Sequence, residues 1–163
     1  DYYIDVEMTS KAISALDFGL NQFPHDLSLS LIKVEVLNTK QLFDDSYRLL
    51  KSLEQFYPNN IDILFNLGKI YSITNRIQTA KIYFENTLNL IRVNDSYNDL
   101  LSDIAYEFLQ IGQNFQAIEV MKRILEINPD DESFYDKKFD GVHLTPEGHK
   151  LIALKIADII KNN

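Results

Sequence analysis

The chain has 163 residues, of which 24 are acidic and 16 basic, so its formal net charge is −8, and it contains no cysteine. The negative charge argues against a nucleic acid as partner, because phosphate binding needs a cationic surface. The lack of cysteine excludes disulfides, thiolate metal ligands and a cysteine nucleophile. The length corresponds to about one domain, and no apolar run approaches the ~20 residues needed to cross a bilayer. We therefore expect a soluble globular protein without membrane insertion, with the cytoplasm slightly favoured over the periplasm.

A spacing of 34 residues runs through the first part of the chain. Pro24 and Pro58 lie 34 residues apart, and each follows a segment typical of a helix end, LDFGLNQFP and LKSLEQFYP. Small residues recur either twelve residues before a proline or 34 residues after the preceding small residue: Ala12, Ser46, Ala80 and Ala117. Small side chains allow two helices to approach closely, and a proline just after a helix prevents its continuation. The spacing therefore predicts a helical repeat.

Each repeat is predicted to contain two helices. The third repeat has an apolar and small stripe at three- and four-residue steps, then the polar turn TNR, then a second stripe: Leu64, Leu67, Gly68 and Tyr71, followed by Ala80, Phe84 and Leu88. The fourth repeat follows the same pattern: Leu101, Ile104, Ala105 and Phe108, a turn at Gly112, then Phe115, Ala117, Met121 and Ile124. We expect antiparallel helix pairs, with Ala80 and Ala117 buried where helices cross. A three-residue excess near RVNDSY predicts a longer helix or a wider loop before the fourth repeat.

This pattern resembles the tetratricopeptide repeat family over residues 1–131, in units at about 1–26, 27–60, 61–97 and 98–131. The resemblance implies an all-α fold, a right-handed superhelix of about four helix pairs whose first helices line a concave face. In the second unit, Val34 and Ser46 occupy the small positions. Tyr2 and Tyr3 would end a first helix whose beginning is missing, so we expect the chain to start inside a repeat. The opening DYYIDVEMTSKA has neither an initiator Met nor the features of a signal peptide, as expected of a processed or trimmed product.

Members of this family bind peptides or helices of other proteins in the concave groove, so the resemblance implies a protein or peptide partner. Counting around the first helices gives the side chains expected to face the groove: Leu31, Glu35, Asn38, Phe65, Asn66, Lys69, Ser102, Tyr106 and Leu109. Leu31, Phe65 and Tyr106 would supply apolar contact area, and we expect Phe65→Ala and Tyr106→Ala to weaken binding without unfolding the chain. Some members clamp a C-terminal carboxylate with paired Lys and Asn side chains. Asn66 and Lys69 form the single such pair and a second lysine is absent, so no carboxylate clamp is expected.

The tail, residues 132–163, does not continue the repeat. Thr145 before Pro146 is typical of a helix start, with Thr145 as N-cap and Glu147 near the positive end of the helix dipole. The helix would run to about Lys161 and would have a broad apolar surface. Because a solenoid needs a terminal element over its last repeat, we expect this helix to act as a cap.

Within the tail, DGVHLTPEGHKLIA resembles the last conserved block of the SGNH (GDSL-type) hydrolases, which are esterases and lipases of α/β fold. The resemblance implies a Ser-His-Asp triad in which His143 is the general base and Asp140 orients its imidazole. The family's Gly-Asp-Ser nucleophile motif has no counterpart, since none of the five glycines lies within two residues of a serine. A metal site built from Asp136, Asp140, His143 and His149 is not expected either, because no known ligand spacing is present.

Two functions follow from these features. We expect a non-catalytic scaffold for protein–protein interaction, without cofactor or metal, that binds a peptide or helix in its groove. The alternative is the C-terminal portion of an SGNH-type esterase whose catalytic core, with the serine nucleophile, is missing from this chain. In the first case the tail is a structural cap, inherited or joined by engineering. In the second, Asp140 and His143 are surviving catalytic residues; a third possibility is that a serine from another chain completes the pair. The oligomeric state is not determined.

Overall fold

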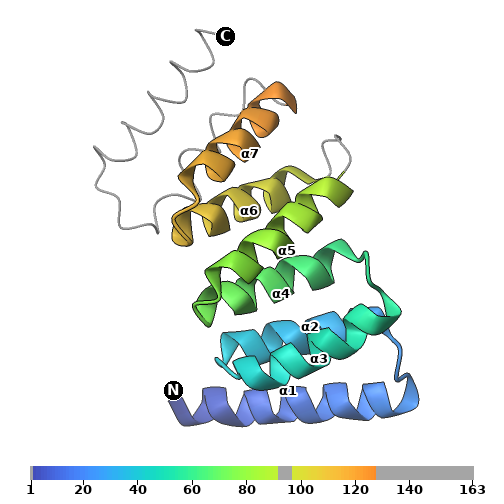
Figure 1. Cartoon of the computed structure of the whole chain (residues 1–163). Coiled ribbons are helices and arrows are strands. Elements are labelled where there is room, and N and C mark those ends of the chain that lie inside the picture. The colour runs from blue at the N-terminus through green and yellow to red at the C-terminus, as the bar shows by residue number, and fades with distance from the viewer. Residues whose placement is uncertain (1, 92–96, 128–163) are drawn as a thin grey trace, which may run out of the picture.

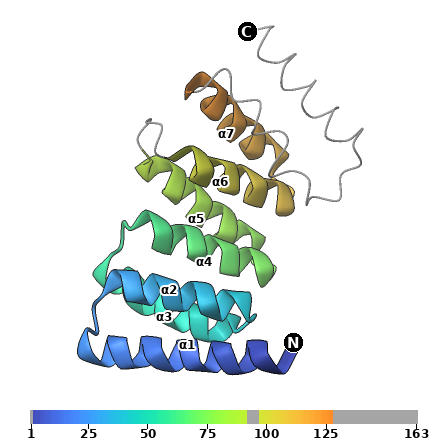
Figure 2. The ribbon, with the colours of Figure 1, turned by 180° about the vertical axis from the view of Figure 1, so that it is seen from behind.

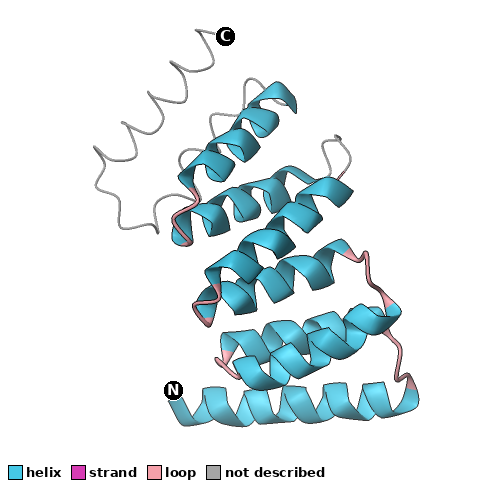
Figure 3. Ribbon diagram, in the orientation of Figure 1, coloured by secondary structure: helices cyan, strands magenta, loops and turns pink. Residues whose placement is uncertain are grey.

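The described part of the structure is entirely helical. The computed structural model describes residues 2–91 and 97–127, and within these ranges every regular element is an α-helix (Figure 3). The helices are α1 (Tyr2–Gln22), α2 (Leu27–Thr39), α3 (Phe43–Phe56), α4 (Ile61–Ile73), α5 (Ile77–Leu90), α6 (Asn98–Gln110) and α7 (Asn114–Ile127). The expected capping helix, Asp140 and His143 lie outside the described residues. The all-α prediction is confirmed.

The helices stack in chain order, as three antiparallel pairs that follow one leading helix (Figures 1 and 2). The pairs are α2 with α3, α4 with α5, and α6 with α7, and α1 packs against α2. The leading helix corrects one expectation. Tyr2 and Tyr3 do not end a preceding helix, because α1 continues without a break from Tyr2 to Gln22. Residues 2–22 therefore form one long helix, which takes the place of the second helix of a repeat.

The turn inside each pair has the same backbone geometry. Gln41, Asn75 and Gly112 stand at equivalent positions and all have positive φ, 59°, 59° and 72°. In each turn the following residue donates its backbone N–H to the carbonyl five residues back, as Arg76 does to Tyr71 over 2.8 Å. This is the helix-ending motif in which one residue adopts the left-handed backbone conformation. The backbone N–H groups that follow can then bond to the last carbonyl groups of the helix. The turn predicted at TNR and at Gly112 is confirmed.

The connections between pairs use side-chain caps. Asp26 accepts a hydrogen bond from the Leu29 N–H over 2.8 Å, and Asn60 accepts one from the Ile63 N–H over 3.0 Å. Each of these N-caps satisfies one of the free N–H groups at a helix start. The helices α3 and α5 have the same length, 14 residues, so α5 is not the longer helix expected as one source of the excess near RVNDSY. The other expectation, a wider loop, concerns residues 92–96, which lie outside the described residues.

The core is built from the small and apolar positions of the repeat. Ala80 and Ala117 are fully buried, as predicted, and so are Phe84 and Phe108, whose rings lie 5.6 Å apart in an edge-to-face arrangement. Phe115 corrects another expectation, since 71% of its surface is exposed. Ala117, Met121 and Ile124 follow one another at helical spacing on the buried face. Phe115 precedes Ala117 by two residues and therefore points away from that face.

Candidate binding groove

A pocket of about 620 Å³ lies between the first helices of the second and third units. Its lining comes from α2 and α4, with one residue from α3: Leu31, Ile32, Glu35, Asn38, Thr39, Phe43, Asp62, Asn66, Lys69, Ile70 and Ile73. In this region α4 makes less contact with α2 than with α6, which leaves room between α2 and α4. It brings together five of the side chains expected to face the groove, namely Leu31, Glu35, Asn38, Asn66 and Lys69.

The pocket combines apolar walls with polar and charged groups. Ile73 is 54% exposed and Ile32 is also exposed, so both offer apolar surface to a ligand. Among the lining residues, Glu35 and Asp62 are acidic and Lys69 is basic. Polar and charged side chains thus line the pocket beside apolar ones, and such groups can orient a ligand.

Lys69 lies over an aromatic ring and within electrostatic range of a carboxylate. Its Nζ lies over the Phe65 ring, 5.5 Å from the ring centroid, as a cation–π contact. Lys69 also lies near Glu107 of the next unit and lowers the pKa of that carboxyl group. The net effect on Glu107 has the opposite direction: its pKa is raised, because burial disfavours the charged form and Asp103 adds negative charge.

Two of the predicted groove residues are buried. Phe65 is only 8% exposed, and its ring centroid lies 6.0 Å from that of Phe84 in the core. Ser102 is also buried. The expectation that Phe65→Ala leaves the fold intact therefore needs correction, since emptying a buried phenylalanine site destabilises a protein by about 3–5 kcal/mol. Tyr106 and Leu109 are partly buried on α6, outside the pocket.

Six of the lining residues were not among the predicted groove residues: Ile32, Thr39, Phe43, Asp62, Ile70 and Ile73. A helical stripe already contained part of this set, since Asp62 and Ile73 continue the Asn66 and Lys69 face at steps of three and four residues. Phe43 could not be found in this way, because it belongs to α3 and reaches the pocket through the turn. Asn66 is held by its own helix, donating from Nδ2 to the Asp62 carbonyl over 2.9 Å.

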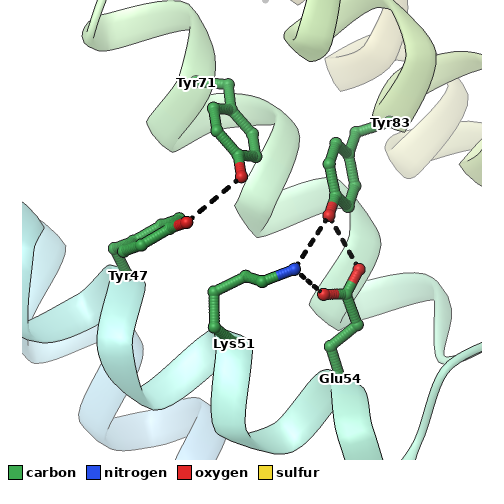
Figure 4. A network of polar contacts seen from close by, with 5 residues as sticks. All are labelled: Tyr47, Lys51, Glu54, Tyr71 and Tyr83. Carbon is green, nitrogen blue, oxygen red and sulfur yellow. Dashed lines mark hydrogen bonds and ion pairs between the residues drawn. The ribbon is translucent and has the colours of Figure 1, made fainter.

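A polar network joins the second unit to the third (Figure 4). Tyr83 of α5 donates from its hydroxyl to Oε1 of Glu54 over 2.8 Å, and Lys51 of α3 forms an ion pair with Glu54. The Tyr71 and Tyr83 rings are stacked with their centroids 5.2 Å apart, and the Tyr47 and Tyr71 hydroxyl groups lie 3.4 Å apart. The network joins α3, α4 and α5.

The ionisation of the network reflects its burial. Burial, aided by the Tyr47 hydroxyl, raises the pKa of Tyr71 to about 12, and burial with the Glu54 hydrogen bond raises the pKa of Tyr83. The hydrogen bond to Glu54 raises the pKa of Lys51, against the opposing effect of burial. Lys51, Tyr71 and Tyr83 therefore keep their protons at neutral pH.

A second, smaller pocket of about 470 Å³ lies on the outer side, among α3, α4 and α5. Its lining includes Tyr83, Asn86 and Asn89, together with Ile82, which is 55% exposed. Its Glu54 is already engaged by Lys51 and Tyr83. We call this second pocket the outer pocket.

Neither a metal-binding cluster nor a membrane-spanning helix is present in the described part of the chain. Among residues 2–91 and 97–127, no three His, Asp or Glu side chains are grouped so that they could hold a metal ion. Within the same ranges, no helix is both long and apolar enough to cross a membrane.

Comparison with known proteins agrees with this architecture. Residues 49–82, from the middle of α3 into α5, match the sequence profile of the tetratricopeptide repeat. No relative was found among curated proteins. The crystal structure of MamA superposes on the chain with a TM-score of 0.63 at 18% identity, covering 100% of this chain and 96% of that one. The fold is the tetratricopeptide-repeat fold.

Two further solved structures share the tetratricopeptide-repeat fold. TTC0263, a thermophilic protein of Thermus thermophilus, has a TM-score of 0.64 at 16% identity, covering 80% of this chain and 71% of its own. YrrB, described as having an unusual peptide-binding site, has a TM-score of 0.58 at 16% identity, covering 74% and 61%. Sequence identities this low show that the fold is shared and show nothing about the function. The function has to be inferred from the groove itself. The resemblance of the tail to SGNH hydrolases concerns residues that the structure does not describe.

Proposed function

We propose that this chain is a non-catalytic scaffold that binds a peptide or a helix of another protein in the groove along α2, α4 and α6. The carrying observation is the pocket between α2 and α4, which gathers Leu31, Glu35, Asn38, Asn66 and Lys69 beside exposed aliphatic side chains. YrrB, which has the same fold, provides the precedent of a peptide-binding site.

Binding in the groove would be favoured by apolar side chains that are exposed on firmly packed helices. Ile32 and Ile73 remain accessible at the pocket, and covering such surface is favourable by about 25 cal/mol per Å². The network of Tyr71, Tyr83 and Glu54 holds α4 against α3 and α5, so a ligand would not have to order these helices on binding. A preformed groove of this kind suits a short segment rather than a large flat surface.

The test uses a library of short random peptides selected on the immobilised chain, followed by Kd measurement for the enriched peptides by fluorescence anisotropy. The matched variants are Ile73→Ala in the groove and Ile82→Ala in the outer pocket, because the two isoleucines are equally exposed. Ile73→Ala should weaken binding about fivefold, as expected for losing a buried aliphatic contact, and Ile82→Ala should leave Kd unchanged. Tyr106→Ala should also weaken binding if the ligand extends onto α6.

The reverse order of effects, with Ile82→Ala weakening binding and Ile73→Ala neutral, would move the site to the outer pocket. Failure to enrich any peptide above a blank support would contradict peptide binding altogether. The esterase alternative is tested separately with a fluorophosphonate probe. We expect no labelled serine; labelling that is lost in His143→Ala would make the chain an enzyme.

A further inference from the structure

The charges of the three inner helices are unbalanced. The helices α2, α4 and α6 together carry five carboxylates, which are Glu35, Asp62, Asp99, Asp103 and Glu107, and two lysines. One of these lysines, Lys33, forms an ion pair with Asp17 of α1, away from the pocket. Lys69 is therefore the one cation that these three helices offer to the groove.

On the outer helices, several acidic side chains have a basic partner on the same helix. On α3, α5 and α7, four acidic residues form ion pairs with a lysine or arginine three or four residues away on the same helix: Asp45, Glu54, Glu85 and Glu119. Glu35, Asp62 and Glu107 have no ion-pair partner within 4 Å among the described residues. The sequence explains this, because none of the three has a basic residue three or four positions away on its own helix.

An acceptor in the groove also lacks a donor. Asn38 lines the pocket, and its Oδ1 is buried without a hydrogen-bond partner in the described part of the chain. The Glu35 and Asp62 carboxylates are exposed and are the charged acceptors that a ligand can reach in this pocket. Lysine and arginine side chains have donors and no acceptor, so they match this surface in both charge and hydrogen bonding.

We propose that the partner segment is cationic, with lysine or arginine side chains that face Glu35 and Asp62 and an aliphatic side chain that packs against Ile32 and Ile73. This inference rests on the proposed function and names the chemical class of its ligand. A second copy of this chain does not fit, because two chains of net charge −8 repel each other. An acidic peptide would place its carboxylates against Glu35 and Asp62 and would have Lys69 alone as counter-charge.

Glu107, on α6 of the neighbouring unit, also favours a cationic partner. Its raised pKa shows that burial is not fully compensated by Lys69. A cation brought by a partner would stabilise this carboxylate, and it would act in an environment less screened than open solvent.

The experiment sequences the peptides enriched on the immobilised chain and compares their lysine and arginine content with that of the unselected library. The best peptide is then measured against two double variants with the same change of charge. Glu35→Gln with Asp62→Asn neutralises the groove, whereas Glu85→Gln with Asp44→Asn neutralises two acids of the outer helices. Asp44 stands in the first turn of α3 as Asp62 does in the first turn of α4, which matches their helix-dipole effects.

We expect basic residues to be enriched and acidic residues depleted, and the groove double variant to weaken binding about three- to tenfold, as expected for two partly exposed ion pairs. The outer double variant should leave Kd unchanged, and added salt should weaken binding to the original chain more than to the groove double variant. Enrichment of acidic or uncharged peptides that still depend on Ile73 would overturn the cationic partner and leave the proposed function intact. Peptides that respond to neither Ile73→Ala nor the groove double variant would overturn both.

Discussion

At the scale of single residues, one acidic side chain on the inner helices lowers the stability of the fold. Glu107 is mostly buried on α6, with Lys69 near enough to influence it but not to form an ion pair within 4 Å. A carboxylate in this position favours its neutral form, so it destabilises the fold whenever it is ionised. Residues that reduce stability in this way are common at functional sites.

Glu107→Gln should raise the melting temperature at neutral pH, because glutamine keeps the shape of the neutral carboxyl group. A folded-state pKa above the unfolded value means that the stabilising contribution of the glutamate is complete below the unfolded pKa, about 4.3. It is lost as the pH rises through the folded-state value. The gain from Glu107→Gln should therefore shrink as the pH falls toward about 4. Thermal unfolding followed by circular dichroism at both pH values measures the difference.

Glu35→Gln provides the control for this prediction, since Glu35 is an exposed acid of the same groove. Its effect on the melting temperature should be small at either pH. A Glu107→Gln variant that is less stable than the original chain at neutral pH would show that Lys69 compensates the buried charge fully.

At the scale of helices, one close approach determines how α4 and α5 pack. Gly68 lies against the Phe84 ring, and an added Cβ would come within 2.7 Å of Phe84 Cδ1. Phe84 is fully buried and has no room to move aside. The absence of a side chain at residue 68 therefore allows α4 to lie directly against the Phe84 ring of α5.

Gly68→Ala should destabilise the chain even though alanine is the better helix former. The helix propensity of alanine favours it by about 0.5–1 kcal/mol, whereas overpacking a rigid ring costs about 1–3 kcal/mol. Gly19→Ala is the matched control, because the nearest atom to its added Cβ is the flexible end of Leu29, at 3.1 Å. Urea unfolding should show a loss of stability for Gly68→Ala and little loss or a gain for Gly19→Ala. Equal effects at the two positions would contradict the crossing described here.

At the scale of the whole molecule, packing is uneven along the stack. The pairs α4 with α5 and α6 with α7 pack more extensively than α2 with α3 or α1 with α2. In residues 8–22 of α1 no side chain is fully buried, and Met8 and Phe18 are exposed. Because each repeat is stabilised mainly by its own packing and by its neighbours, the first part of the stack should open more readily than the rest.

Native-state hydrogen exchange tests this gradient. Amide groups of α1 and α2 should exchange at least about tenfold faster than those of α4 and α5. A ligand in the groove should slow exchange in α2, which forms one wall of the pocket. Uniform protection from α1 to α7 would show that the stack opens as a single cooperative unit.

The repeat and its register could be predicted from the order of residues alone, because both depend on local spacing. Small residues at Ala80 and Ala117 and the turn at Gly112 reflect helix crossings and helix ends, which recur at fixed intervals along the chain. The same spacing placed LSLSLIKVEVL in the first helix of the second repeat, and in the structure this segment is α2, which contacts α1 and α3.

The shape of the groove required the packed structure. Whether a first-helix side chain lines the groove or enters the core depends on how far its helix lies from the next one. Phe65 became part of the core, while Ile73, on the same helix, stayed exposed in the pocket. Phe43 reaches that pocket from a different helix. Spacing along one helix specifies which side chains share a face, but distances between helices result from the sum of all side chains between them.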